Sequence, residues 1–207
     1  MDIHLVARNL KKAFNRRVIF QDVSFTAGVQ QILLIAGRNG SGKSTLVKIL
    51  ADVLSPTEGT VDLEPRARAM FGARSNMVGF VAPYMMLYDE FTARENLQMA
   101  LTIRAMRPDK SYINELLSRV GMANRMDDQV RTFSSGMKQR VKYAFALVHH
   151  PPILLLDEPM SNLDEEGIGM VRDIMDEHRQ MGILVVATND LTDIHHHDIR
   201  VDLNAAH

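Results

Sequence analysis

Cysteine and tryptophan are absent from this chain of 207 residues, and tyrosine occurs only 4 times. Without cysteine there can be no disulfide framework, no cysteine-ligated zinc site, no iron–sulfur cluster and no thiol nucleophile. The absence also fits a reducing compartment. Any chemistry must therefore come from hydroxyl, carboxylate, amine, imidazole and backbone groups.

An excess of charge of one sign is lacking as well. The 24 lysines and arginines are balanced by 25 aspartates and glutamates, which leaves a formal net charge of −1. Proteins that bind nucleic acid through its phosphates usually carry a marked positive charge, so we expect no nucleic-acid partner. The basic stretch Arg66, Arg68 and Arg74 and the histidine run 195–197 are interpreted as solvent-exposed segments.

Long hydrophobic runs are missing too. The apolar runs at residues 32–36, 153–156 and 183–187 are far shorter than the ~20 residues that a membrane-spanning helix needs. The N-terminal residues carry scattered charges instead of the apolar stretch of a signal peptide. The sequence therefore predicts a polypeptide that does not cross a membrane by itself and works in the cytoplasm.

The order of apolar segments predicts an α/β fold. Residues 32–36 are continuously apolar, as in a strand buried on both faces, and they lead into a glycine-rich loop and an amphipathic helix at 44–53. The runs 153–156 and 183–187 repeat this strand pattern around a helix expected at 165–181. Strand, helix and strand in alternation are typical of a mainly parallel sheet.

Two further segments complete the expected architecture. Short β-type runs before residue 30 predict an antiparallel β element, and three helical stripes lie between residues 84 and 150. The first of these helices begins at the capping box formed by Thr92 and Glu95. We expect one domain, 1–207, with 1–83 and 151–207 as the α/β core and 84–150 as an inserted helical subdomain.

The glycine-rich loop carries the clearest chemical motif. Residues 37–44 fit the pattern G-x-x-x-x-G-K-[ST], placed between a buried strand and a helix as a phosphate-binding P-loop requires. Backbone N–H groups and the helix N-terminus would bind phosphate oxygens, Lys43 would reach the β and γ phosphates, and Ser44 would ligate Mg²⁺. The candidate binding residues are Gly37, Arg38, Asn39, Gly40, Ser41, Gly42, Lys43, Ser44 and Thr45.

A pair of carboxylates follows the apolar run at 153–156. Asp157 stands at the end of this expected strand, where it can bind Mg²⁺, and Glu158 is one residue further, where it can polarise a water that attacks a γ-phosphate. An acidic pair at a strand end is by itself often only a solvated edge. The P-loop in the same chain favours the catalytic interpretation.

A third motif indicates a family. Residues 133–140, Phe-Ser-Ser-Gly-Met-Lys-Gln-Arg, open a helix with Ser134 as its expected N-cap and resemble the signature motif of ATP-binding cassette (ABC) ATPases. Residues 161–164, Ser-Asn-Leu-Asp, resemble the D-loop of the same family. P-loop, signature, acidic strand and D-loop follow in the family's order, and the resemblance covers most of the chain.

The resemblance implies a P-loop NTPase fold, ATP and Mg²⁺ as cofactors, and a head-to-tail dimer with a second ABC ATPase subunit. Each ATP would lie between the P-loop of one subunit and Ser134, Ser135 and Gly136 of the other. Asp164 would help to organise the dimer contact, and Phe14 occupies the place of an aromatic that stacks on adenine. The alternative for Phe14 is a core phenylalanine at a strand end.

Two positions depart from the family pattern. The family usually has a glutamine after hydrophobic-Gly-aromatic-hydrophobic, whereas residues 78–82 are followed here by Pro83 and Tyr84. The histidine expected after the last apolar strand is replaced by Asn189, which can donate a hydrogen bond to a γ-phosphate but cannot carry a proton. We therefore expect ATP binding and dimerisation with slow hydrolysis, in which Glu158, Lys43 and Asn189 are the catalytic candidates.

The favoured hypothesis is the ATP-binding subunit of an ABC transporter that drives a separately encoded integral membrane permease from the cytoplasmic face of the membrane. Residues 84–91 stand where the family docks its permease, and the apolar cluster 84–88 within them suits such a contact. The size resembles small export ATPases, including those of the haem type. One alternative is a soluble ABC ATPase that acts on nucleic acid or ribosomes. Another is a slowly hydrolysing module that uses ATP for dimerisation.

Overall fold

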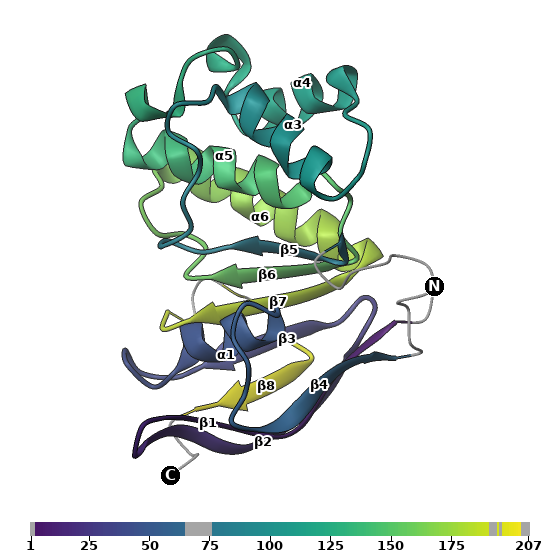
Figure 1. Ribbon diagram of the computed structural model, residues 1–207, viewed down its shortest axis with the longest axis vertical. Helices are drawn as coiled ribbons and strands as arrows, with labels where there is room; N and C mark the ends of the chain where they lie inside the picture. The colour runs from purple at the N-terminus through teal and green to yellow at the C-terminus, as the bar shows by residue number, and fades with distance from the viewer. Residues whose placement is uncertain (1–2, 65–75, 191–193, 195, 204–207) are drawn as a thin grey trace.

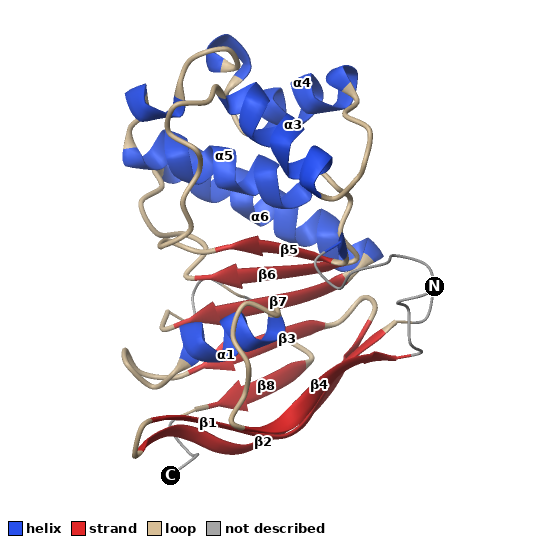
Figure 2. Ribbon diagram, in the orientation of Figure 1, coloured by secondary structure: helices blue, strands red, loops and turns tan. Residues whose placement is uncertain are grey.

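The computed structural model describes residues 3–64, 76–190, 194 and 196–203 (Figure 1). Two β-sheets and a layer of helices make up this part of the chain (Figure 2). The smaller sheet is antiparallel, with the order β2-β1-β4, and consists of β1 (His4–Phe14), β2 (Arg17–Gly28) and β4 (Glu58–Glu64). The expected N-terminal β runs therefore belong to one long hairpin. Arg66, Arg68, Arg74 and His195 lie outside the described residues.

The larger sheet is parallel and has the order β5-β6-β7-β3-β8. Its strands are β3 (Ile32–Ala36), β5 (Val78–Val81), β6 (Ile153–Asp157), β7 (Ile183–Thr188) and β8 (Ile199–Asp202). Every residue of β3, β6 and β7 is buried, because helices or the smaller sheet cover both faces. This confirms the expected α/β class with a mainly parallel sheet.

The two faces of the parallel sheet contribute to two separate hydrophobic cores. Leu154 and Leu156 of β6 belong to the core shared with the helical layer, whereas Ile153 and Leu155 belong to the core shared with the smaller sheet. This alternation follows from the period of two along a strand. The helix α1 (Lys43–Leu50) packs in the second core, on the face opposite to the helical layer.

The helical layer consists of α3 (Ala93–Ile103), α4 (Lys110–Arg119), α5 (Ser135–Leu147) and α6 (Glu165–Met181), together with the short 3₁₀ turns Ala123–Arg125 and Val130–Thr132. Figure 1 shows α5 and α6 next to the parallel sheet and α3 and α4 further out. The helices α3, α4 and α5 fall between residues 84 and 150. The expected division into an α/β core, 1–83 and 151–207, and a helical subdomain, 84–150, stays a prediction.

Two strands of the parallel sheet were not expected from the sequence. β8 has polar residues at alternate positions and only 4 residues, so its apolar content is too small to indicate a strand. β5 is equally short and contains Gly79. A side chain at Gly79 would place its Cβ 2.5 Å from the carbonyl oxygen of Ala146, so the glycine allows α5 to approach the sheet closely.

Thr92 forms the expected capping box at the start of α3. Its hydroxyl accepts a hydrogen bond from the Glu95 N–H at 3.1 Å, and the Glu95 carboxylate accepts one from the Thr92 N–H at 2.8 Å. The substitution Thr92→Ala should lower the free energy of unfolding by about 1 kcal/mol, and the melting temperature by about 2–4 °C in calorimetry. Thr102 in the same helix, whose hydroxyl donates to the Gln98 carbonyl oxygen and caps no helix end, is the matched control. Equal shifts for Thr92→Ala and Thr102→Ala would contradict the role of the cap.

Candidate functional site

The P-loop and the acidic strand end meet at the carboxyl edge of the parallel sheet. The P-loop follows Ala36, the last residue of β3, which pairs with Thr188 of β7. Asp157, the last residue of β6, pairs with Ala187 of the same β7. In open α/β sheets, ligands bind at this edge, beyond the carboxyl ends of the strands. The structure therefore brings two motifs together that lie more than a hundred residues apart in the sequence.

Two glycines of the P-loop have backbone conformations that other residues rarely adopt. Gly40 has a φ of 81° and Gly42 a φ of 101°. A Cβ atom at Gly42 would also lie 2.6 Å from Cγ2 of Ile19. Gly42 is the N-cap of α1 and provides no side-chain hydrogen bond, and the first turn of this helix contains no acidic residue. The N-terminus of α1 thus keeps its N–H groups and partial positive charge for an anion.

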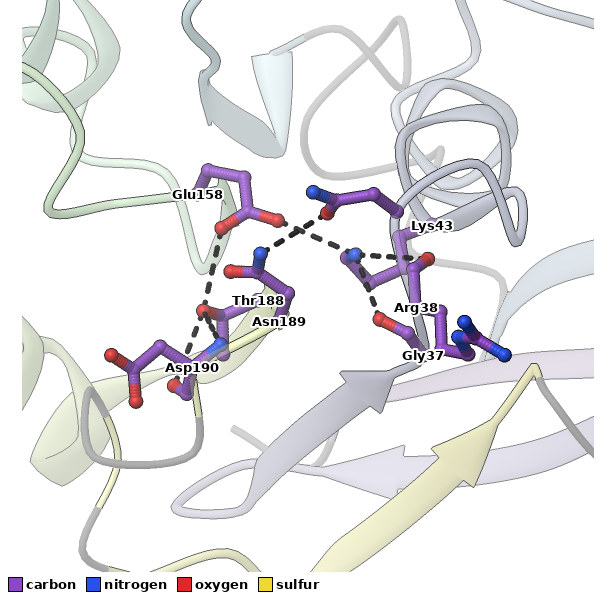
Figure 3. Close-up of polar contacts among 8 residues, drawn as sticks. Gly37, Arg38, Lys43, Glu158, Thr188, Asn189 and Asp190 are labelled. Atoms are coloured by element: carbon purple, nitrogen blue, oxygen red, sulfur yellow. Dashed lines mark hydrogen bonds and ion pairs between the residues drawn. The ribbon is translucent and has the colours of Figure 1, made fainter.

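Lys43 is 5% exposed, and its ammonium group points into the P-loop (Figure 3). The Nζ atom donates hydrogen bonds to the carbonyl oxygens of Gly37 at 2.9 Å and Arg38 at 3.5 Å. It also lies 3.4 Å from the carboxylate of Glu158. The lysine predicted to bind phosphate and the glutamate predicted to activate water are therefore neighbours.

Glu158 is positioned by the backbone and by a buried hydroxyl. Its φ of 47° lies in the left-handed region, and its N–H donates to the carbonyl oxygen of Ala187 at 2.8 Å. The Thr188 hydroxyl lies 3.4 Å from the Glu158 carboxylate and also accepts from the Asp190 N–H at 3.0 Å (Figure 3). Thr188 was not among the site residues predicted from the sequence. Its place at the end of a buried strand was the signal that could have indicated it.

Asp157 carries a buried carboxylate at the end of β6. It is 1% exposed, and neither of its oxygens has a hydrogen-bond partner in the described part of the chain. The Ser41 hydroxyl of the P-loop is also buried without a partner there. Burying such groups unpaired is costly, and oxygen donors are the ligands that Mg²⁺ prefers. Asp157 beside the P-loop therefore fits a divalent cation.

Asn189 connects the end of β7 to the P-loop. Its Nδ2 donates to Oδ1 of Asn39 at 3.1 Å. A cavity of about 480 Å³ opens at this contact. Its lining is formed by Ala36, Gly37, Arg38, Asn39, Thr188, Asn189 and Arg200. Arg200 belongs to the unexpected strand β8, so the sequence offered no reason to place it at the P-loop.

Phe14 ends β1 and is 47% exposed, so it is not a core phenylalanine. The Lys12 ammonium lies 4.8 Å from the centroid of its ring. An exposed aromatic ring can stack on a planar base. Its assignment to adenine stays a prediction.

The signature residues lie at the start of α5. Ser134 is the N-cap and accepts a hydrogen bond from the Met137 N–H at 3.3 Å, and both Ser134 and Ser135 are exposed. At Gly136 a Cβ would lie 3.2 Å from the carbonyl oxygen of Asn162, so the signature packs against the D-loop. α5 and α1 pack on opposite faces of the parallel sheet. Within one chain, the signature helix and the P-loop helix therefore belong to different hydrophobic cores.

Asp164 is the N-cap of α6. Its carboxylate accepts from the Gly167 N–H at 2.9 Å and pairs with the Arg140 guanidinium of α5 at 2.8 Å. These interactions, the Gly167 N–H first, hold the pKa of Asp164 below its usual value. Arg140 also reaches Glu166 at 3.4 Å. Asp164 thus ties the D-loop to the signature helix within the chain, a contact that the sequence did not indicate.

Tyr84 belongs to the loop after β5, a position that did not mark it as a site residue. Burial, and then the negative charge of Asp157, raise the pKa of Tyr84. The Lys48 ammonium of α1 lies 4.0 Å from the centroid of the Tyr84 ring. The tyrosine therefore contacts the helix that follows the P-loop.

Among the described residues, no helix combines the length and the apolar character needed to span a membrane. The sequence matches the ABC transporter family over residues 20–161. It is 32% identical to the lantibiotic transport ATP-binding protein SrtF of Streptococcus pyogenes over 93% of this chain and 82% of that protein. It is 35% identical to the lipoprotein-releasing system ATP-binding protein LolD 1 of Caulobacter vibrioides over 89% of this chain and 85% of that protein.

Solved structures agree in fold. A putative ABC transporter ATP-binding protein from Pyrococcus furiosus superposes with a TM-score of 0.82 at 19% identity, with 98% of each chain covered. At this level of identity the likeness concerns the fold alone. It confirms the expected arrangement of a P-loop core, an antiparallel sheet and a helical layer.

Proposed function

The chain belongs to the ABC transporter family, and from this premise we propose that it drives a separately encoded membrane permease by ATP-dependent closure of a dimer. As a member of this family it is an ATP-binding and ATP-hydrolysing subunit of a transporter. The observation that carries the proposal is the match to transport ATP-binding proteins over most of both sequences.

The nucleotide-binding part of the proposal follows from the P-loop geometry. The free N-terminus of α1 and the Lys43 ammonium would bind the phosphates of ATP. Ser44 and Asp157 would hold Mg²⁺, and their oxygen donors and the unpaired Asp157 carboxylate support this assignment. The bound cation would neutralise negative charge on the β and γ phosphates.

The hydrolytic part of the proposal depends on Glu158. We assign its carboxylate as the base that polarises the attacking water. It is held by Thr188 and paired with Lys43, so the arrival of phosphates at Lys43 would release Glu158 from its ion pair. Asn189, which faces Asn39 of the P-loop, would donate a hydrogen bond to the γ-phosphate. An asparagine cannot take over a proton, so we expect slow turnover.

A second subunit would complete each site, with an identical copy as the simplest partner. Ser134, Ser135 and Gly136 form an exposed helix N-terminus that is suited to phosphate oxygens. This helix and the P-loop helix pack on opposite faces of one chain, which favours contact between P-loop and signature across a dimer. Asp164 would lie at that contact and would keep its position through Arg140.

The proposed permease-docking surface is the loop 84–91 between β5 and α3. Met86 is 85% exposed and Tyr88 53% exposed, so two large apolar side chains of one short loop face outward. The loop is anchored to α5, because Lys142 donates to the Pro83 carbonyl oxygen at 2.8 Å and Lys138 pairs with Asp89 at 2.7 Å. A movement of the loop would therefore also move the signature helix α5. This surface would place the chain on the cytoplasmic face of the membrane.

We retain export as the proposed direction. The two relatives are named for lantibiotic transport and for lipoprotein release. Neither name refers to haem, so the haem-type cargo gains no support from them. Both names concern transport, which favours the permease hypothesis over action on nucleic acid or ribosomes.

Co-purification tests the proposal. The tagged chain, extracted from membranes in mild detergent, should retain a multi-span integral protein encoded by an adjacent reading frame, identified by mass spectrometry. The substitution Met86→Asp should reduce this protein at least about tenfold, because a charge buried in an apolar interface remains unpaired. Ile103, an exposed apolar residue at the end of α3, supplies the control Ile103→Asp, which should retain the partner. Recovery with ribosomes or nucleic acid instead would favour the soluble alternative.

A further inference from the structure

The cavity beside the P-loop carries two guanidinium groups that the proposed binding of ATP does not use. Arg38 and Arg200 are the charged residues of its lining, and no acidic residue is among the described residues that line it. Figure 3 shows the Arg38 side chain pointing away from Glu158. The side chain of Arg200 is 44% exposed and pairs with Asp202 of the same strand at 3.0 Å. Two guanidinium groups beside one carboxylate leave the cavity with an excess of positive charge, which suits an anionic occupant.

The start of α6 carries the opposite charge. Asp164, Glu165 and Glu166 follow one another there, and all three are exposed. Arg140 pairs with Asp164 at 2.8 Å and with Glu166 at 3.4 Å, whereas Glu165 takes no part in these two ion pairs. Acidic residues stabilise the first turn of a helix by themselves. Three carboxylates against one guanidinium nevertheless leave an excess of negative charge on the surface.

Both charged regions lie at the carboxyl edge of the parallel sheet. The cavity begins at Ala36, the last residue of β3, and α6 begins after β6 and the D-loop. Figure 1 shows the arrowheads of the parallel strands and the beginning of α6 on the same side of the molecule. Two strands, β7 and β3, lie between β6 and β8. The acidic and the basic region therefore occupy different parts of one edge, and a second copy can bring them together.

We propose that the arginine-lined cavity of one chain receives the acidic start of α6 from a second copy, with Glu165 facing Arg200. The inference rests on the proposed dimer, in which the P-loop of each chain meets the signature helix of the other. Such a dimer has a two-fold axis, so the contact forms twice, once beside each P-loop. Opposite charges would then favour the head-to-tail arrangement, because an arrangement that places cavity against cavity would oppose arginine to arginine.

The test measures the dissociation constant of the dimer by analytical ultracentrifugation in Mg²⁺ and ATP, with Glu158→Gln as the parent because it should accumulate the dimer. Arg200→Glu and Glu165→Arg should each raise this constant at least about tenfold, because each opposes like charges in both contacts. The double variant Arg200→Glu with Glu165→Arg should return to within about threefold of the parent. Arg107→Glu, at an exposed arginine between α3 and α4, changes the net charge equally and should leave the constant unchanged.

The outcomes separate this inference from the proposed function. If Glu158→Gln forms no dimer, the proposed closure and this contact fall together. If it dimerises and both charge reversals leave the dissociation constant unchanged, only the contact fails. Weaker ATP binding by Arg200→Glu alone, or no recovery in the double variant, would mean that the arginine serves the nucleotide or the fold of its own chain, which also overturns the inference. Arg200→Gln, which adds no charge beside Asp202, should weaken the dimer in the same direction and replaces Arg200→Glu if that variant does not fold.

Discussion

Glu158→Gln is expected to lower steady-state ATP turnover by about 10²–10⁴-fold, while ATP binding persists. Glutamine keeps the size of the side chain and its contact distance to Thr188, but its amide cannot accept a proton from water. The ion pair with Lys43 is also lost, which leaves the ammonium free for phosphate. ATP should therefore remain bound and the dimer should stay closed.

The measurement combines a single-turnover ATPase assay with light scattering to determine the oligomeric state in Mg²⁺ and ATP. The wild type should turn over more slowly than ~10 s⁻¹, a typical enzyme rate, and the variant should accumulate as a dimer. Glu115→Gln, at an exposed glutamate of α4, is the control and should behave as the wild type. Hydrolysis by Glu158→Gln at the wild-type rate would show that another group is the base. A monomer with bound ATP would contradict the proposed closure.

The same assay separates transport coupling from the alternative of an ATP-dependent dimerisation module. If neither the wild type nor Glu158→Gln hydrolyses ATP measurably, asparagine in place of the family's histidine at position 189 has removed useful turnover, and the module is favoured. A clear difference between the two proteins means that Glu158 still activates water. The buried Thr188 hydroxyl and the left-handed backbone at Glu158 support the second result, because both hold the carboxylate in one place.

Local sequence patterns predicted the helices and strands whose formation is decided by residues close together in the sequence. The helix expected at 165–181 is α6 as observed, and the capping box at Thr92 begins α3. The buried strands at 32–36 and 153–156 were predicted from continuous apolar runs, and each lies between two other strands of the parallel sheet. These features need only periodicity, capping and turn chemistry.

Contacts between distant segments could not be predicted in this way. Three side chains reach the site because their strands lie beside β3 or β6 in the sheet: Thr188 of β7, Arg200 of β8 and Tyr84, which follows β5. Local periodicity predicts single strands but does not predict their order in the sheet. The pairing of Arg140 with Asp164 likewise depends on the packing of α5 beside α6. The sequence identified the motifs, whereas the side chains that hold them in position became evident only from the fold.

Lys43→Met is expected to reduce ATP affinity by more than about 100-fold. A hydrogen bond to a charged group contributes about 1.5–3 kcal/mol, and each 1.4 kcal/mol corresponds to a factor of ten, so two lost phosphate contacts account for this change. Methionine fills a similar volume in the buried position, and the carboxylate of Glu158, 29% exposed, remains partly hydrated without its partner. The free energy of unfolding should therefore change far less than the binding energy.

Binding is best measured by calorimetric titration with ATP, together with a thermal unfolding curve of the unliganded protein. Lys110→Met, at an exposed lysine that begins α4, removes the same charge away from the P-loop and should bind ATP as the wild type does. Near-normal ATP affinity of a folded Lys43→Met would mean that the N–H groups at the start of α1 bind the phosphates without the ammonium. In that case the contacts of Lys43 with Gly37 and Glu158 would serve to shape the loop and not to recognise the nucleotide.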